Sequence, residues 1–199
     1  LVGIALGTSG AILQGLFRNP LVDPGFIGVS SGAAIGALLV IMFSKIFITI
    51  FHQSILPYLL PIFAMSGSLV TTYMVYRISK SSNKTNIMTM LLAGIAINAL
   101  VGSIIGVLVI SSSDLQLRTF TFWTLGGLDR ANWEVVCISS IFILIPICYV
   151  YNLRNKLDIF MLGDSEAINL GINVENLKKI IILISSLMVG VSVSFCGMI

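Results

Sequence analysis

The sequence is poor in charged residues. Asp, Glu, Lys and Arg make up only 10% of its 199 residues, whereas soluble domains contain about a quarter. Hydrophobic residues make up 57%, and the mean hydropathy is +1.05. So few charges could not cover the surface of a soluble domain of this length, which indicates a lipid-embedded protein. The net charge of +3 gives no indication of a nucleic-acid partner.

Residues that could hold a metal or carry out catalysis are also scarce. No C-x-x-C spacing occurs, so we predict neither a zinc site nor disulfide bonds. No charged residue or histidine lies at the middle of a long apolar run, which disfavours an ion-coupled carrier and an intramembrane metalloenzyme. No phosphate-binding G-x-x-x-x-G-K-[ST] motif occurs, so we predict no enzyme activity and no bound cofactor. The cysteines are Cys137, Cys148 and Cys196, and the single histidine is His52.

Long apolar runs predict the fold. A helix needs about 20 mainly apolar residues to cross about 30 Å of hydrocarbon. Helices are expected because each backbone polar group in lipid must be satisfied within its own segment. We therefore predict an all-α, polytopic transmembrane bundle that forms one membrane domain over residues 1–199. Six spans are expected, at residues 1–17, 26–43, 56–76, 87–111, 134–151 and 179–199.

The basic residues divide unequally between alternate loops. Lys and Arg are retained on the cytoplasmic side of short membrane loops. One set of loops holds most of them, so we predict that this set is cytoplasmic and that the first span runs from outside to inside. The larger set is Arg18, Arg77, Lys80, Lys84, Arg154, Lys156, Lys178 and Lys179, and the smaller set is Lys45, Arg118 and Arg130.

Glycines recur four residues apart within three of the predicted spans. This spacing lets helix backbones approach closely. Such close packing drives helix association in lipid, where the hydrophobic effect does not. We predict that these glycines pack helices within the bundle, with a dimerisation face as the alternative. They are Gly3 and Gly7, then Gly28, Gly32 and Gly36, then Gly102 and Gly106.

Two prolines mark the loop between the first two spans. Pro20 and Pro24 each prevent a helix from continuing, so the chain must turn here. Residues 13–33 read L-Q-G-L-F-R-N-P-L-V-D-P-G-F-I-G-V-S-S-G-A. This pattern resembles the signature of the FecCD family of permeases, which import iron-siderophores, haem and cobalamin. The signature positions of this inner loop are Gln14, Arg18, Asn19, Pro20, Pro24, Gly25 and Gly28.

A second segment resembles the family at the outer side. Residues 118–128 read R-T-F-T-F-W-T-L-G-G-L, similar to the family pattern R-x-x-x-F-W-x-L-G-G/S-L. The resemblance implies a segment that faces the substrate-binding protein. An aromatic belt at the membrane interface explains its two tryptophans equally well. The positions concerned are Arg118, Trp123, Gly126, Gly127 and Trp133.

A polar hairpin separates the fifth and sixth predicted spans. Asp164 or Ser165 can cap a short helix that Gly171 ends, and Asn173 can cap a second, with Glu175 in its first turn. We predict two short cytoplasmic helices within residues 157–177. The stretch resembles the family's L-G-(D/E)-x-x-A-x-x-L-G coupling element, which sits in a groove of the ATP-hydrolysing subunit. The implied coupling positions are Gly163, Asp164, Ala167, Leu170 and Gly171.

The resemblance also implies a translocation path. In the family, the helix that corresponds to residues 87–111 lines the path, and an inner gate lies in the loop before it, here residues 79–86. This loop departs from the family pattern, so its gate residues are not assigned. Asn98 and Ser103 could face the path, and helix packing explains them at least as well.

Together these features predict the permease subunit of an ATP-binding-cassette importer in the bacterial cytoplasmic membrane. The expected cargo is chelated iron, a ferric siderophore first and haem or cobalamin otherwise. The expected partners are a separate ATPase subunit that binds ATP and Mg²⁺, a second permease copy or homologous permease, a substrate-binding lipoprotein or periplasmic protein, and membrane lipid. An ion-coupled secondary transporter and a non-transporting membrane assembly component are the alternatives. By the family register, the first helix and the last three of ten lie outside this chain, which we expect to be a fragment.

Overall fold

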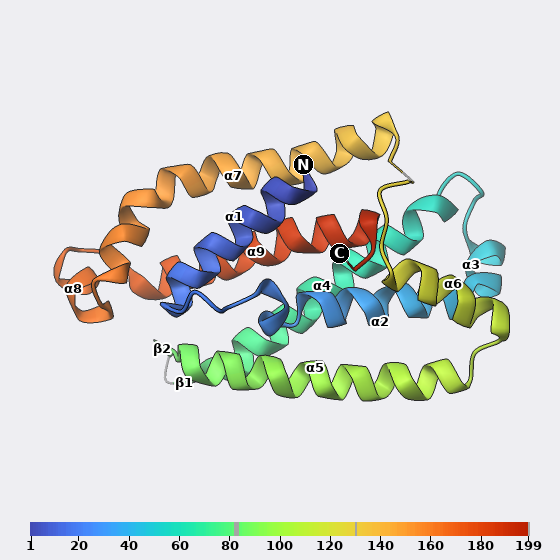
Figure 1. Cartoon of the computed structure of the whole chain (residues 1–199), viewed down its shortest axis with the longest axis horizontal. Helices are drawn as coiled ribbons and strands as arrows, with labels where there is room; N and C mark the ends of the chain where they lie inside the picture. Colours follow the sequence, from blue (N-terminus) through green and yellow to red (C-terminus); the bar gives the residue numbers. More distant parts are fainter. Residues whose placement is uncertain (82–83, 130, 199) are drawn as a thin grey trace.

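The computed structural model describes residues 1–81, 84–129 and 131–198. The chain forms an elongated helical bundle with one short hairpin (Figure 1), which confirms the predicted all-α membrane fold. The helices are α1 (Val2–Phe17), the 3-10 helix η1 (Pro24–Ile27), α2 (Val29–Met42), α3 (Ser44–Ile50), α4 (Leu56–Ser79), α5 (Ile87–Ile110), α6 (Asp114–Thr124), α7 (Trp133–Met161), α8 (Asp164–Asn169) and α9 (Val174–Cys196). The strands are β1 (Lys80–Ser81) and β2 (Lys84–Thr85), which pair antiparallel.

The long helices coincide with the predicted spans. Among the described residues, α4, α5, α7 and α9 are long and apolar enough to cross a membrane. The second predicted span is α2, and together with α3, which is bent from it by 70°, it meets the same criterion as a broken span. The first is α1, an apolar helix of 16 residues and hence about 24 Å long. Four predicted spans are therefore confirmed as unbroken helices.

Helix α7 is longer than predicted. The sequence predicts a span over residues 134–151, but the helix continues to Met161 and has 29 residues, about 43 Å of helix against about 30 Å of hydrocarbon. The predicted end was wrong because Arg154, Lys156 and Asp158 mark the membrane boundary without interrupting the helix. Neither Gly nor Pro occurs between Pro146 and Gly163. The last turns of α7 therefore extend beyond the apolar segment.

Glycine permits the close crossing of α2 and α4. A methyl group on Gly32 would overlap the Thr71 hydroxyl and the Gly67 carbonyl, and one on Gly36 would overlap the Phe63 carbonyl. The prediction of glycine-mediated packing is thus confirmed for α2. The described residues show no such packing for the remaining pairs, where an added methyl group would meet no described atom within 4 Å; these are Gly3, Gly7, Gly102 and Gly106.

Helix α9 forms the centre of the bundle. It packs against α1, α4, α7 and α2, and in Figure 1 it runs between α1 and α7 on one side and α2 and α4 on the other. Two thirds of its apolar window is buried (67%), compared with 17% for α5 and 6% for α7. The outward faces of α5 and α7 are therefore apolar and open, as lipid or another membrane subunit requires.

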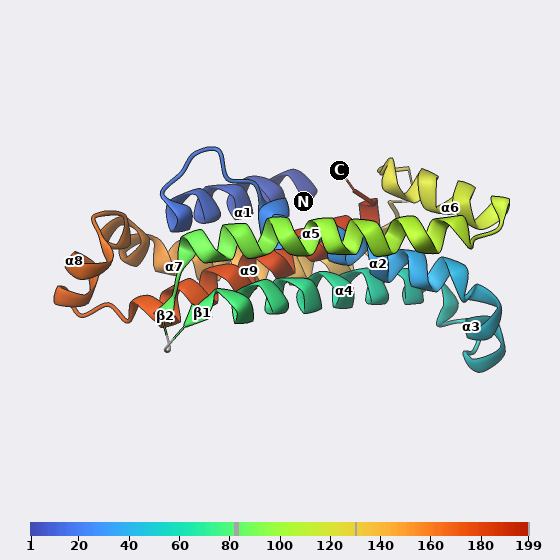
Figure 2. The ribbon, with the colours of Figure 1, turned by 90° about the horizontal axis from the view of Figure 1, so that it is seen from below.

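The two ends of the bundle differ in their loops. The β1–β2 hairpin, α8 and the end of α1 gather at one end, and α3 and α6 lie at the other (Figures 1 and 2). We call the first the basic end, because Arg18, Lys80, Lys84 and Lys178 belong to it. Arg130 of the smaller basic set and residues 82–83 of the predicted gate loop lie outside the described residues.

Candidate coupling site

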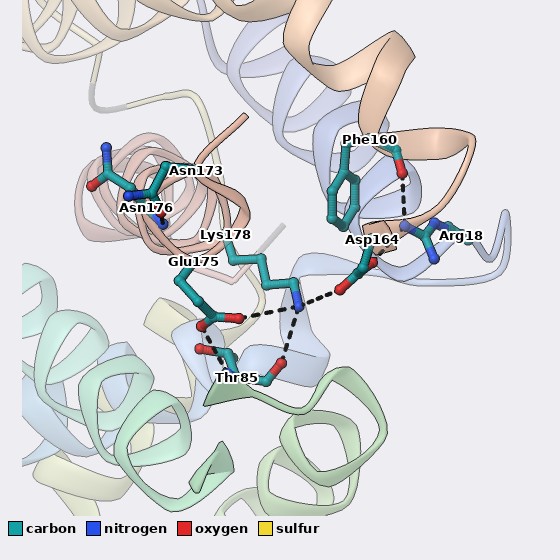
Figure 3. Close-up of polar contacts among 8 residues, drawn as sticks. All are labelled: Arg18, Thr85, Phe160, Asp164, Asn173, Glu175, Asn176 and Lys178. Atoms are coloured by element: carbon teal, nitrogen blue, oxygen red, sulfur yellow. Dashed lines mark hydrogen bonds and ion pairs between the residues drawn. The ribbon is translucent and has the colours of Figure 1, made fainter. Parts of the chain in front are cut away.

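Four charged side chains from three parts of the chain meet at the basic end. They are Arg18 after α1, Asp164 at the start of α8, and Glu175 and Lys178 in the first turns of α9 (Figure 3). Two are cations and two are anions, so the cluster is neutral when all four are ionised. Its members connect the predicted coupling element to the signature loop and to the hairpin before α5.

Arg18 joins the end of α1 to the end of α7 and to α8. Its guanidinium donates to the Phe160 carbonyl at 2.7 Å and to Asp164 Oδ1 at 2.6 Å, and it stacks over the Phe160 ring at 4.6 Å. Arg18 has a φ of 50°, the left-handed conformation, which among the described residues no other non-glycine adopts. That conformation costs about 1–2 kcal/mol for an L-residue, so these three contacts explain why arginine is held there.

Lys178 is the buried member of the cluster. Its side chain is 5% exposed, and its ammonium donates to Asp164 Oδ2 at 2.8 Å, the Thr85 carbonyl at 3.2 Å and Glu175 Oε1 at 3.4 Å. A lysine ammonium has three donors, so each finds an acceptor. A buried charge is tolerated only when it is paired in this way.

The hairpin is held through the backbone of Thr85. Glu175 Oε2 accepts from the Thr85 N–H at 2.8 Å, while Lys178 donates to the carbonyl of the same residue. Both polar backbone groups of β2's last residue are therefore satisfied by α9. The next residue, Asn86, caps α5 by accepting from the Thr89 N–H at 3.1 Å, so the hairpin leads directly into that helix.

The two cations keep Asp164 ionised. Partial burial raises the pKa of its carboxyl group, but the hydrogen bonds and charges of Lys178 and Arg18 outweigh burial and bring the pKa below its ordinary value of 3.8. Asp164 is therefore a carboxylate at neutral pH. Both of its oxygens are engaged, one by each cation.

The start of α8 differs from the prediction. The sequence predicts that Asp164 or Ser165 caps this helix, but Gly163 occupies the N-cap position with a φ of 144° and no side chain caps the helix. Asp164 does not cap because its oxygens bind Arg18 and Lys178 instead. At the other end Gly171, with a φ of 81°, follows the helix as predicted, and the Ile172 N–H donates to the Ala167 carbonyl at 2.9 Å.

The second short helix was also predicted wrongly. Asn173 does act as an N-cap, accepting from the Asn176 N–H at 3.0 Å, but the helix it caps is α9 itself, which runs without a break to Cys196. Val174 to Lys178 continue into the apolar run with no Gly or Pro between them, so nothing ends the helix there. The polar hairpin therefore contains one short helix.

The faces of α8 have different environments. Asp164 points toward the cluster, and Ala167 is fully buried against the bundle. Of the predicted coupling positions, only Leu170 projects a large side chain outward. Four large apolar side chains of α8 and its flanks are exposed, beside the exposed polar residues Ser165, Glu166 and Asn169; they are Met161 (55% exposed), Leu162 (71%), Ile168 (60%) and Leu170 (62%). We call these four residues the apolar knob.

A family model described as the FecCD transport family matches residues 1–199. The chain belongs to the FecCD transport family. This confirms the resemblance found in the inner loop, the outer segment and the polar hairpin. The family consists of transport permeases and not of enzymes, and the chain is a multi-pass protein of the bacterial cytoplasmic membrane, as predicted.

Known proteins resemble the chain along its whole length. It is 42% identical to the hemin transport system permease protein HmuU of Yersinia pestis, covering 100% of this chain and 58% of that protein. It is 31% identical to the cobalamin import system permease protein BtuC of Halobacterium salinarum, over 98% of this chain and 50% of that protein. A solved structure, described as an inward-facing conformation of a candidate metal-chelate type ABC transporter, matches with a TM-score of 0.86 and 28% identity over 98% of this chain and 60% of that one. The chain thus spans about half the length of the relatives it matches.

The FecCD signature loop turns as predicted. Asn19 Oδ1 accepts from the Leu21 N–H at 2.9 Å, and Asp23 Oδ1 accepts from the Gly25 N–H at 2.7 Å and so caps η1. Pro24 is buried at the start of η1, and Gly28, with a φ of 83°, ends η1 and begins α2. Gln14 and Pro20 are exposed. Of the signature side chains, Arg18 alone reaches the cluster.

The predicted path residues have different surroundings. Asn98 Oδ1 accepts from the Ser31 hydroxyl at 2.7 Å, and its amide donates to the Gly25 carbonyl at 3.0 Å. It also lines a cavity of about 490 Å³ between η1, α2, α5 and α6. Ser103 is exposed and donates to the Ala99 carbonyl of its own helix at 2.9 Å. Helix packing therefore accounts for part of the role of Asn98.

The FecCD outer segment is folded onto the bundle. Trp123 is 5% exposed and stacks on Phe120 with ring centroids 6.3 Å apart, so an aromatic belt does not explain it. Trp133 is 82% exposed and fits that explanation. Gly126 has a φ of 67°, and the Gly127 N–H donates to the Cys196 carbonyl at 2.8 Å. The Arg118 guanidinium lies 5.6 Å from the centre of the Phe122 ring.

Proposed function

We propose that this chain forms part of the permease of an ATP-binding-cassette importer, and that the importer moves a metal chelate across the cytoplasmic membrane. Haem is the first substrate to test, because a relative at 42% identity is named as a hemin permease, whereas a relative at 31% is named for cobalamin. Ferric siderophores are chelates of the same broad class and form the next group of substrates. Among the described residues that line the cavity beside Asn98, Asp23 is the one charged side chain, so the lining does not favour one of these substrates.

The apolar knob is the observation that carries this proposal. Its four large side chains are exposed at the end where the charged residues and the hairpin lie. Exposed apolar patches rimmed by polar residues mark protein interaction sites. A soluble ATPase subunit that receives α8 in a groove would remove these side chains from water. The inner face of the same helix is already fixed by Asp164 and Ala167.

The other partners follow from the open surfaces of the bundle. An importer of this class requires a path wider than one small bundle provides, so we expect a second permease copy or a homologous permease beside the exposed face of α5. A substrate-binding lipoprotein or periplasmic protein would deliver the chelate to the end formed by α3 and α6. ATP binding in the ATPase would then shift the permease pair between outward-open and inward-open states.

The transport test uses the full-length protein with its ATPase and binding protein in proteoliposomes. Uptake of iron-labelled haem should require ATP and should persist when proton and sodium gradients are dissipated. Ferric siderophore and cobalamin are measured in parallel, so the substrate is decided in the same experiment. Uptake that depends on an ion gradient and does not require ATP would refute the proposal.

The docking test alters the knob alone. Ile168→Asp and Leu170→Asp should each reduce the amount of ATPase that copurifies with the permease by at least about tenfold, because a buried unpaired charge at an interface costs several kcal/mol. Leu115→Asp on α6, where the side chain is 75% exposed at the opposite end, serves as the matched control. Equal copurification in all three variants would show that α8 does not contact the ATPase.

A further inference from the structure

Lys178 has a position that no sequence motif indicates. It lies in the second turn of α9, yet its side chain is 5% exposed, whereas the adjacent Lys179 is exposed. Its three acceptors come from α8, from β2 and from α9 itself, through Asp164, Thr85 and Glu175. Figure 3 shows the ammonium directed between the carboxylate of α8 and the strand before α5.

The polar connection from α8 to the hairpin runs through this one ammonium. Among the cluster's side-chain bonds in residues 1–81, 84–129 and 131–198, Asp164 is linked to Thr85 through Lys178, directly and by way of Glu175. A cleft of about 770 Å³ lies between the same elements and is lined by Lys84, Asn86, Ser165 and Asn173, among others. Lys178 therefore bridges two surfaces that both line this cleft.

We propose that Lys178 is a positioning residue that makes the hairpin before α5 move together with α8. This inference rests on the proposed function, in which the ATPase displaces α8. Displacement of Asp164 would carry the ammonium with it, and the ammonium and Glu175 hold both backbone groups of Thr85. Because Asn86 caps α5 immediately after β2, the start of α5 would follow. The bond from Lys178 to Asp164, at 2.8 Å, has the length of a charge-assisted hydrogen bond.

The first test measures transport per ATP hydrolysed. In proteoliposomes that contain the full-length permease, its ATPase and its binding protein, Lys178→Met should leave ATP hydrolysis within about twofold of wild type and reduce haem uptake by about tenfold. Lys179→Met is the same change at an exposed neighbour and should leave ATP hydrolysis and haem uptake within about twofold of wild type. A wild-type ratio of uptake to hydrolysis in Lys178→Met would overturn the proposal. A purely structural role would lower hydrolysis and uptake together.

The second test needs no ATPase and therefore separates the two proposals. Spin labels are placed at the exposed positions Ser81 on β1 and Asn169 on α8 of the full-length permease in detergent. The wild type should give one narrow distribution of the distance between the two labels. Lys178→Met should give a broader distribution, and Lys179→Met should match the wild type. An unchanged distribution in Lys178→Met would overturn the role of Lys178 even if transport works. Failure of any ATPase to bind wild-type permease would instead refute the proposed function.

Discussion

Asp164→Asn isolates the contribution of one carboxylate to the cluster. The substitution preserves the size of the side chain and removes the negative charge that lies 2.6 Å from Arg18 and 2.8 Å from Lys178. Removing one partner of a fully buried pair costs about 3–5 kcal/mol, whereas a fully exposed pair contributes about 0.2–1 kcal/mol. Asp164 is 40% exposed, and Lys178 keeps Glu175 and the Thr85 carbonyl. We therefore expect the free energy of unfolding to fall by about 1–2 kcal/mol.

The assay is denaturant unfolding of the full-length protein in detergent at neutral pH. Asp158→Asn is the matched control, because Asp158 is exposed near the end of α7 and its loss should change the free energy of unfolding by less than about 0.5 kcal/mol. A double-mutant cycle with Lys178→Met gives the interaction itself. In the Lys178→Met background, Asp164→Asn should cost less than in the wild type.

Two results would refute this reasoning. One is a free energy of unfolding in Asp164→Asn that equals that of the Asp158→Asn control. The other is an Asp164→Asn effect that is the same with and without Lys178, which would show that the two side chains contribute independently. Either result would remove the cluster as a connection between α8 and α9.

Three further predictions follow from the same structure. Lys178 and Arg18 lower the pKa of Asp164, so as the pH falls this carboxyl group is protonated in the unfolded chain before it is protonated in the folded one. The stability gained from the carboxylate is therefore complete at neutral pH and is lost as the pH falls below 3.8. In denaturant titrations below that pH, the free energies of unfolding of the wild type and Asp164→Asn should converge. Gly32→Ala should destabilise by about 1–3 kcal/mol through overlap with α4, while Gly102→Ala, which meets no atom within 4 Å, should not. Asn98→Ala should lower the free energy of unfolding by about 0.5–1.5 kcal/mol in the same assay, because it removes the hydrogen bonds to the Ser31 hydroxyl and the Gly25 carbonyl while that carbonyl still accepts from the Gly28 N–H.

The fold could be predicted from the sequence where local signals determine it. The apolar run at residues 87–111 matches α5 within one residue at its C-terminal end, and the two prolines of the signature loop produce the predicted turn. The end of α7 could not be found from hydropathy, because hydropathy reports the membrane boundary and not the end of the helix. Helix α6, which lies in the outer segment, is amphipathic and too short for a span, so a search for apolar runs does not detect it.

The candidate site could be located from the sequence but not assembled. The motifs place Arg18 and Asp164 in the two loops that meet at the basic end, and the spacing of Glu175 and Lys178 suggests a helical pair. Nothing local indicates that Thr85, 93 residues before Lys178, supplies the acceptor that allows this lysine to be buried. A six-residue helix is also too short for its periodicity to separate an inner from an outer face. The inward orientation of Asp164 and Ala167 therefore required the tertiary structure.

The small size of α8 explains why its inner face must be so firmly bonded. A single helix of six residues is unstable in isolation, so α8 persists only because Ala167 is buried and Asp164 binds two cations. The positive φ angles of Gly163 and Gly171 mark the two points at which the backbone turns into and out of this helix. A partner bound to the apolar knob would thus displace a short rigid element between two glycines. Arg18 would transmit that displacement to the ends of α1 and α7, and Lys178 would transmit it to α9 and the hairpin. If the proposal is right, substituting the two cations one at a time should separate movement of α1 and α7 from movement of α5.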